Sequence, residues 1–303
     1  MQDLRLKGHQ APLVLGFQNF ADYPAHSPYF GATAGRVANR IRDGRFMLDG
    51  REVQVERNFM GKHALHSGKQ GIGKRNWRIV DHGPDFVRLE IRDPDGQGGF
   101  PGNVKIITEY RIAGGALRVF IHATTDKPTL VNIAHHSYFN LEDGGATDCL
   151  DHQVKITAEA ITHLDDDLIP DGSLQLVAGT PYDFRDFTPI RHDTNDGPFA
   201  HDINYCVSAA RTGLRPVAWA KAPTSGVELE VSSTEPGMQL YTGSKIGGRP
   251  AIGLHGKPYE AFGGFCFEAQ CWPDAPNHPH FPSIELRPGE TYVQTTVYAF
   301  RKI

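Results

Sequence analysis

The segment FCFEAQCW, residues 265–272, places a single carboxylate in a run of apolar and aromatic residues. An ionised carboxylate loses its hydration when it is buried, so burial would raise the pKa of Glu268 towards the range in which a general base works near neutral pH. The other interpretation is structural, with Glu268 paired to an arginine such as Arg40. The residues alone leave both interpretations open.

A second polar feature interrupts the apolar run VNIAHHSYFNL, residues 131–141, in which His135 and His136 are adjacent. The β-branched and aromatic residues around them predict a buried strand. Because successive side chains of a strand point to opposite faces, we expect His135 to lie with the apolar set and His136 with a polar set that includes Asn132 and Asn140. A buried imidazole needs partners for its nitrogens, so this polar face requires an explanation.

Histidines together with a carboxylate also suggest a 2-His-1-carboxylate metal site. Adjacent histidines on a regular strand cannot both face one ion, however, and the chain has no HExxH motif. The GxSxG motif of a serine nucleophile is absent, and GQGGFPG (96–102) lacks the Lys-Ser/Thr of a phosphate-binding loop. The sequence thus offers acid–base groups, and we expect neither a metal nor a cofactor.

Alternation of apolar and polar residues with a period of two predicts the elements that must position these groups. The alternation is clear in residues 87–92, 104–108, 117–123 and 227–231, and Gly114-Gly115 joins the second of these runs to the third. The segment TYVQTTVYAF (291–300) is typical of a terminal strand. Asp49-Gly50 separates two β-prone arms in FMLDGREVQV (46–55), a strong hairpin signal. We therefore expect an all-β fold of antiparallel strands, a sandwich or a barrel, in one domain over residues 1–303.

The chain has 303 residues and a net charge of −4, with acids and bases interspersed. This composition argues against a nucleic-acid surface and against a polybasic membrane anchor. The N-terminus has no signal-peptide pattern, and no window approaches 18 apolar residues, so we expect a cytoplasmic protein. We expect the four cysteines to be small buried thiols and not disulfides: Cys149, Cys206, Cys266 and Cys271.

Six segments in order along the chain resemble the galactose mutarotases, or aldose 1-epimerases. They are GRVANRI (35–41), LHSG (65–68), HHSYFNL (135–141), EPGMQLYTG (235–243), FEAQCWPDAPNHPHFPS (267–283) and LRPGETY (286–292). DPDGQGGFPGNV (93–104) also fits, and the match runs from about Leu15 to the C-terminus. The resemblance implies a large antiparallel β-sandwich with a sugar cleft on one sheet face.

The resemblance also implies an activity, the interconversion of the α and β anomers of a free aldohexose such as galactose or glucose. That reaction needs one base and one acid and no cofactor. By resemblance Glu268 removes the O1 proton and His136 protonates the ring oxygen, with His66 beside them as an orienting or polarising donor. Four residues fall at the family's sugar-binding positions: Asn39, Arg40, Asp202 and Gln239.

Two features depart from the family pattern. His135 stands where the family often has Asn, and this change should be tolerated if the side chain points away from the sugar. Family members usually begin with strands upstream of the segment that matches LVLGF (13–17), and we expect those strands to be missing here.

Two other functions are compatible with the same fold. A non-catalytic sugar-binding β-sandwich module would need only the groups that bind hydroxyls, whereas here both proposed acid–base residues are present. An epimerase acting on a phosphorylated hexose would need a cluster of cations near the cleft, and only Arg40 is clearly placed there. The preferred aldose cannot be read from the sequence, and we expect a monomer or a weak homodimer.

Overall fold

The computed structural model describes residues 1–302, and its regular structure is almost entirely β. One short α-helix and four 3-10 turns are present in that range: α1 (Asp22–His26), η1 (Arg42–Gly44), η2 (Ile72–Lys74), η3 (Gln97–Gly99) and η4 (Ala275–Asn277). None of the helices in the described part of the chain has the length and apolarity needed to span a bilayer.

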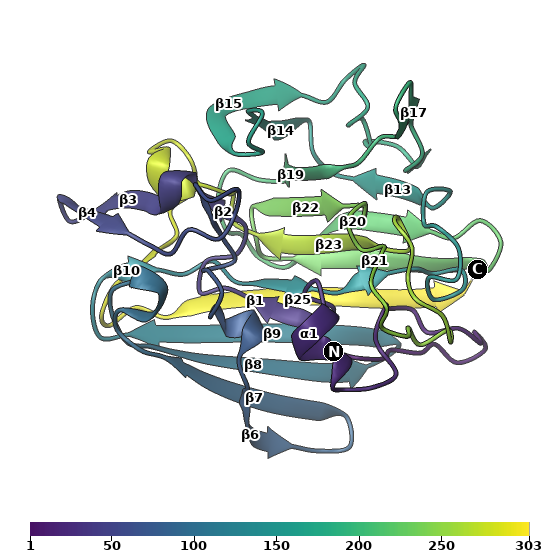
Figure 1. Ribbon diagram of the computed structural model, residues 1–303, viewed down its shortest axis with the longest axis horizontal. Helices are drawn as coiled ribbons and strands as arrows, with labels where there is room; N and C mark the ends of the chain where they lie inside the picture. The colour runs from purple at the N-terminus through teal and green to yellow at the C-terminus, as the bar shows by residue number, and fades with distance from the viewer. Residues whose placement is uncertain (303) are drawn as a thin grey trace.

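A nine-stranded antiparallel sheet is the largest element, and the C-terminal strand lies in its middle (Figure 1). In spatial order its strands are β16 (Thr188–Pro189), β13 (Gln153–Ile156), β20 (Arg215–Lys221), β21 (Val227–Ser233), β25 (Tyr292–Lys302), β9 (Ala116–Thr125), β8 (Val104–Ala113), β7 (Phe86–Asp93) and β6 (Arg78–His82).

A six-stranded antiparallel sheet forms the second layer. In spatial order its strands are β12 (Tyr138–Phe139), β23 (Phe265–Gln270), β22 (Gly237–Tyr241), β19 (Asp202–Cys206), β14 (Ala160–Leu164) and β15 (Pro170–Leu176). Five small two-stranded pairs complete the fold: β1 (Ala32–Ala34) with β11 (Ala134–His136), β2 (Arg40–Ile41) with β5 (Ala64–Leu65), β3 (Arg45–Leu48) with β4 (Arg51–Gln54), β10 (Thr129–Leu130) with β24 (Glu285–Leu286), and β17 (Asp193–Thr194) with β18 (Gly197–Pro198).

The main hydrophobic core combines apolar side chains from both large sheets, which confirms the expected β-sandwich. Alternation explains how each strand contributes to it. On β9, Leu117, Val119 and Ile121 are buried in the core, whereas Arg118 and His122 are exposed. Each fully buried aliphatic side chain of this kind contributes about 1.5–3 kcal/mol of transfer free energy, which makes this core the main source of stability.

Both turns predicted from glycine-containing dipeptides are confirmed. Asp49 and Gly50 have φ of 48° and 74° and join β3 to β4, as a two-residue hairpin turn requires. Gly114 and Gly115 have φ of 58° and 76° and join β8 to β9 in the same way.

The prediction of a single strand over residues 131–141 is wrong. The segment divides into β11 and β12, which pair with different partners: β11 with β1, and β12 with β23 in the six-stranded sheet. The two asparagines expected on the polar face with His136 instead satisfy backbone groups. Asn132 exchanges hydrogen bonds with the backbone of Cys271, and Asn140 donates to two loop carbonyls. Both are structural residues because they hold loops against the sheet.

Candidate active site

The candidate site lies on the face of the six-stranded sheet that points away from the main core. On β23, Phe265 and Phe267 belong to the core between the sheets, so the alternate residues Cys266 and Glu268 point to the opposite face. The strand register places Gln239 of β22 directly beside Glu268. Period-two alternation therefore gathers polar side chains on one face of otherwise apolar strands.

Glu268 is 2% exposed, and its two carboxyl oxygens have different surroundings. Oε1 lies 3.6 Å from Nε2 of His136, and Oε2 is buried with no hydrogen-bond partner. Desolvation raises the pKa of Glu268 to about 8; the negative charge of Asp202 raises it further, and Arg40 opposes the change. A buried carboxyl oxygen without a partner is costly in the empty protein and is a natural acceptor for a ligand hydroxyl.

The structural interpretation of Glu268 as the partner of Arg40 is wrong. The guanidinium of Arg40 donates from Nη2 to Oδ2 of Asp202 at 2.8 Å, and no ion pair joins it to Glu268 in the described residues. In the part of the chain that the structure describes, Glu268 pairs with the imidazole of His136.

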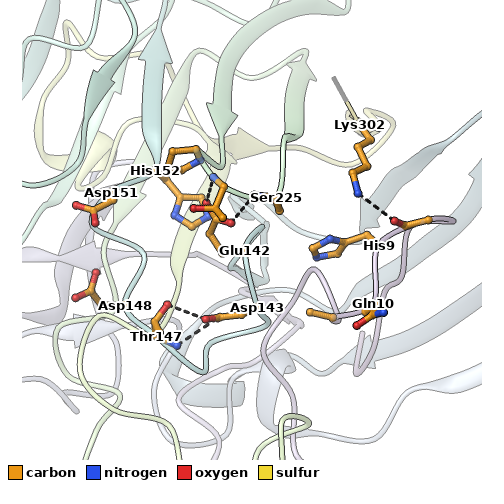
Figure 2. Close-up of a pocket in the computed structure, with 14 residues that line it drawn as sticks. His9, Gln10, Glu142, Asp143, Thr147, Asp148, Asp151, His152, Ser225 and Lys302 are labelled. Carbon is orange, nitrogen blue, oxygen red and sulfur yellow. Dashed lines mark hydrogen bonds between the residues drawn. The ribbon is translucent and has the colours of Figure 1, made fainter.

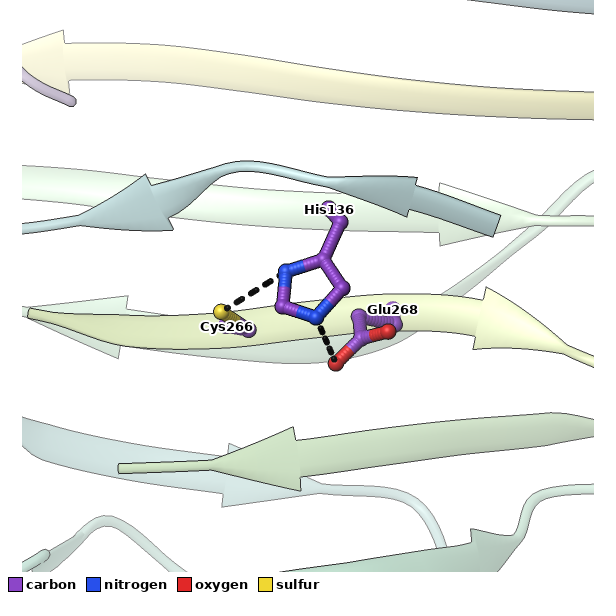
Figure 3. A group of neighbouring side chains, drawn as sticks. All are labelled: His136, Cys266 and Glu268. Carbon is purple, nitrogen blue, oxygen red and sulfur yellow. Dashed lines mark hydrogen bonds and ion pairs between the residues drawn. The ribbon is translucent and has the colours of Figure 1, made fainter. Parts of the chain in front are cut away.

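His136, on β11, lies between Glu268 and Cys266, as Figure 3 shows. Its Nε2 faces Oε1 of Glu268, and its Nδ1 lies 3.6 Å from Sγ of Cys266. Burial lowers the pKa of His136 to about 4 because desolvation disfavours the imidazolium. Burial thus favours the uncharged form of both Glu268 and His136, and between pH about 4 and about 8 the pair holds a single proton.

His135 points away from this pair, as the strand alternation predicted. Its Nε2 lies 2.8 Å from Oγ of Ser137, its Nδ1 lies 3.5 Å from the hydroxyl of Tyr110, and its ring packs against Tyr298. These contacts account for both nitrogens, so His135 is a satisfied buried histidine.

His66 is positioned by a loop that turns sharply beside β2. Its backbone has a φ of 49°, and its Nδ1 accepts a hydrogen bond from the backbone N–H of Asn39 at 3.1 Å. Burial lowers the pKa of His66 well below its ordinary value, so the ring is neutral and its hydrogen resides on Nε2. The ring lies 5.4 Å from that of His136, with Tyr29 packed against both. His66 is therefore suited to donate a hydrogen bond and unsuited to act as an acid.

The four expected sugar-binding residues form one hydrogen-bonded chain beside the histidine pair. Asn39 Oδ1 accepts the backbone N–H of Arg40 at 2.9 Å. Arg40 donates to Asp202, and Gln239 Nε2 donates to the other oxygen of Asp202 at 2.7 Å. Gln270 in turn donates to Oε1 of Gln239 at 3.3 Å, which fixes the orientation of that amide. The structure thus brings all seven predicted residues into one neighbourhood.

Sequence reasoning missed three residues of this neighbourhood. Cys266 and Gln270 flank Glu268 at a spacing of two on β23, so the same alternation that placed Glu268 would have placed them on its face. Tyr29 has a backbone φ of 71° and packs beside both His66 and His136, a role that nothing in its local sequence indicates.

Cys266 belongs to the one group of metal-ligand side chains found together in the described residues, with His136 and Glu268. All four cysteines are free thiols, as expected, but Cys206 is only half-buried and not buried as predicted. Burial raises the pKa of Cys266 well above its ordinary value, so its sulfur is a protonated thiol in the empty site.

A separate cavity of about 700 Å³ lies beside the loop that follows β12 (Figure 2). Its acidic residues are engaged in holding loops. Glu142 accepts the backbone N–H groups of Thr224 and Ser225, and Asp143 accepts those of Gly145 and its neighbours. None of the seven predicted site residues lines it, so this cavity is not part of the candidate site.

Comparison with known proteins gives a consistent result. The sequence model of a family described as aldose 1-epimerase matches residues 1–299. The galactose mutarotase of Bos taurus is 40% identical over 297 residues, covering 97% of this chain and 85% of its own length. An aldose 1-epimerase of Escherichia coli (strain K12) is 34% identical over 295 residues, covering 95% of this chain and 84% of its own length.

Solved structures agree with the sequence matches. An aldose epimerase homologue from C. elegans has a TM-score of 0.88 at 30% identity, covering 96% of this chain and 88% of its own. A galactose 1-epimerase from Lactobacillus acidophilus has a TM-score of 0.83 at 25% identity, covering 99% and 88%. Sequence and fold are thus shared over nearly all of this chain.

Proposed function

The chain belongs to the aldose 1-epimerase family and is a mutarotase, and we propose that Glu268 and His136 carry out its reaction. The substrate is a free aldohexose such as galactose or glucose. One observation carries the assignment: Glu268 combines a buried, unpartnered Oε2 with an imidazole 3.6 Å from Oε1. A base and an acid are thus adjacent on one sheet face, and the base has a free acceptor atom for the sugar.

In the reaction Glu268 takes the proton from the O1 hydroxyl while His136 gives a proton to the ring oxygen. The C1–O5 bond breaks to give the open aldehyde, which rotates about C1–C2. The ring closes on the other face of C1 when the two proton transfers run in reverse. No group leaves and no electron is gained or lost, so two proton-transfer groups are sufficient.

This chemistry requires the shared proton to reside on His136 while Glu268 is ionised. In the empty site burial favours the opposite arrangement, with the proton on the carboxyl. Moving it from Glu268 to His136 leaves the charge of the pair unchanged. A sugar hydroxyl that donates to Oε2 of Glu268 favours the carboxylate, because hydrogen bonds to the charged form stabilise it. Substrate binding therefore prepares the base.

The polar chain of Asn39, Arg40, Asp202 and Gln239 is suited to hold the remaining sugar hydroxyls. Arg40 is held by Asp202 and lies over the ring of Phe59, with its carbon Cζ 4.7 Å from the ring centroid. The Asp202 side chain is 26% exposed, so it is accessible to a ligand. His66 contributes a further donor from its Nε2.

The two alternative functions have less support. A binding module has no use for an unpartnered carboxyl oxygen beside a buried imidazole, since both groups destabilise the empty protein. For a phosphorylated hexose, the cation that the sequence singled out, Arg40, is already paired with Asp202. A free aldohexose fits these contacts better.

Polarimetry tests the proposal directly. Freshly dissolved α-D-glucose and α-D-galactose should reach anomeric equilibrium faster with the protein than in buffer alone. Glu268→Gln should lose most of this acceleration because it removes the base. Glu159→Gln makes the same chemical change on the surface, where the Glu159 side chain is 78% exposed, and should keep the wild-type rate. A protein that binds sugar but leaves the buffer rate unchanged would be a binding module and not an enzyme.

A further inference from the structure

His136, Cys266 and Glu268 place three kinds of metal ligand on one sheet face: an imidazole nitrogen, a sulfur and a carboxylate oxygen. One ligand atom from each residue lies within 4.8 Å of the others, and all three side chains are buried. Cys266 and Glu268 are alternate residues of β23, and His136 reaches them from β11 (Figure 3). The mutarotation chemistry uses two of these residues and leaves Cys266 without a part in proton transfer.

We propose that these three residues form a binding site for a thiophilic divalent cation such as Zn²⁺, and that filling this site stops catalysis. The cation would be an inhibitor and not a cofactor. Metal binding follows from the three side chains alone, whereas its effect on catalysis rests on the proposed function.

The spacing of the ligand atoms is close to what zinc requires. Zinc binds sulfur at ~2.3 Å and nitrogen or oxygen at ~2.0–2.2 Å, so two ligands of one tetrahedral ion lie roughly 3.3–3.7 Å apart. The separations of Sγ from Nδ1 and of Oε1 from Nε2 are both 3.6 Å. Since these separations involve different nitrogens of His136, the imidazole must turn so that one nitrogen serves the ion together with both neighbours.

Only weak contacts oppose this adjustment within the described residues. The 3.6 Å contact between Sγ of Cys266 and Nδ1 of His136 is a hydrogen bond to sulfur, which is weak, and the 3.6 Å separation of Nε2 from Oε1 of Glu268 is longer than a usual hydrogen bond. Oε2 of Glu268 has no partner there. Asp202, by contrast, has its two oxygens engaged by Arg40 and Gln239, so it is a poor additional ligand. Three protein ligands leave the fourth zinc position open to water.

The ligand chemistry predicts which cations bind. A thiolate and an imidazole favour Zn²⁺, Co²⁺ and Cd²⁺, whereas Mg²⁺ and Ca²⁺ favour oxygen ligands. Binding must displace the proton of the Cys266 thiol, so the affinity should rise with pH. A bound ion occupies Glu268 and His136 together, so it removes the base and the acid at once and should compete with the sugar.

Titration of the reduced protein with Co²⁺ in a non-chelating buffer tests the site without using activity. Wild type should develop a thiolate-to-cobalt absorption band in the near ultraviolet. Cys266→Ser should lose the band and bind Zn²⁺ in calorimetry roughly tenfold more weakly or worse. Cys206→Ser, which changes a half-buried cysteine outside the three-residue group, should behave as wild type. Mg²⁺ should give no heat of binding.

Polarimetry with added Zn²⁺ tests the second half of the proposal. The wild-type rate should fall as the site fills, recover on chelation, and be protected by high sugar concentration. A cobalt band that survives Cys266→Ser, or no band in wild type, would overturn the metal site. A band that depends on Cys266 while the mutarotation rate stays constant would instead overturn the inhibition and remove Glu268 and His136 from the chemistry.

Discussion

Replacing Glu268 by Gln should lower activity and at the same time remove a destabilising effect of pH. The side chain keeps its shape but can no longer act as a base, so the rate should fall by ~10²–10⁴. At alkaline pH the variant should be more stable relative to wild type than it is at acidic pH. The folded pKa of about 8 lies above the ordinary 4.5, so between these values the folded state holds a proton that the unfolded state has lost. Stability contributed by the protonated carboxyl is therefore lost as pH rises through this window.

The magnitude follows from the two pKa values. At 1.36 kcal/mol for each pKa unit, the whole window corresponds to on the order of 5 kcal/mol for wild type, or about 1.4 kcal/mol for each pH unit. Glu268→Gln has no carboxyl to ionise. The free energy of unfolding of the variant minus that of wild type should therefore increase by about 1.4 kcal/mol for each pH unit up to pH 8. Above pH 8 the difference should become constant.

Urea unfolding of both proteins at a series of pH values between 6 and 9 measures this difference. The other titrating groups are the same in the two proteins, so subtraction isolates Glu268. Exposed Glu159→Gln provides the control and should follow wild type at every pH. If the Glu268 variant kept the wild-type rate, the residue would have no part in the reaction. If its stability fell with pH as steeply as that of wild type, the buried, neutral carboxyl would be refuted.

Three other outcomes are expected. His136→Asn should lower the polarimetric rate by ~10²–10⁴. His135→Asn should keep the rate within a small factor, although it should lose some stability because the contacts of His135 with Ser137 and Tyr110 are removed. The reverse ranking of the two rates would contradict the assignment. The kcat/KM of wild type should rise with pH through about 4 and fall through about 8, because the pair is competent while it holds one proton; a rate still rising at pH 9 would rule this out. Activity should survive exhaustive chelation because the proton transfers need no Lewis acid, and a loss restored by one specific metal would show that a metal takes part.

The strands could be predicted from the sequence because their signal is local. On β9 every second residue from Leu117 to Ala123 is apolar, and that pattern fixes which face is buried whatever the neighbouring strands are. The segment 131–141 has no such local pattern to define the strand boundaries. Its composition is β-prone throughout, but Ser137 separates two short strands that belong to different pairs, and pairing is decided by distant residues.

The residues of the site could be named from the family resemblance, but their relations could not. Asn39 and Gln239 are far apart in sequence and become neighbours of one chain of hydrogen bonds only through the fold. The choice between a catalytic and a bridging Glu268 depended on whether Arg40 had a nearer carboxylate. Asp202 provides one, and its distance from Arg40 could not be read from the linear sequence.

The distribution of protons is the point at which structure changes the chemistry expected from sequence. The resemblance suggests an ionised base beside a charged acid, whereas burial on this sheet face favours a neutral carboxyl beside a neutral imidazole. These two arrangements contain the same number of protons, so the pH range of activity is the same for both. They differ in what the substrate must contribute. With the ionised pair the sugar binds to a prepared site, whereas with the neutral pair part of its binding free energy is used to ionise Glu268 through the unpartnered Oε2. On the proposed mechanism, burial favours the uncharged form of Glu268 and His136 in the empty protein, and they become a base and an acid when a hydroxyl group occupies the site.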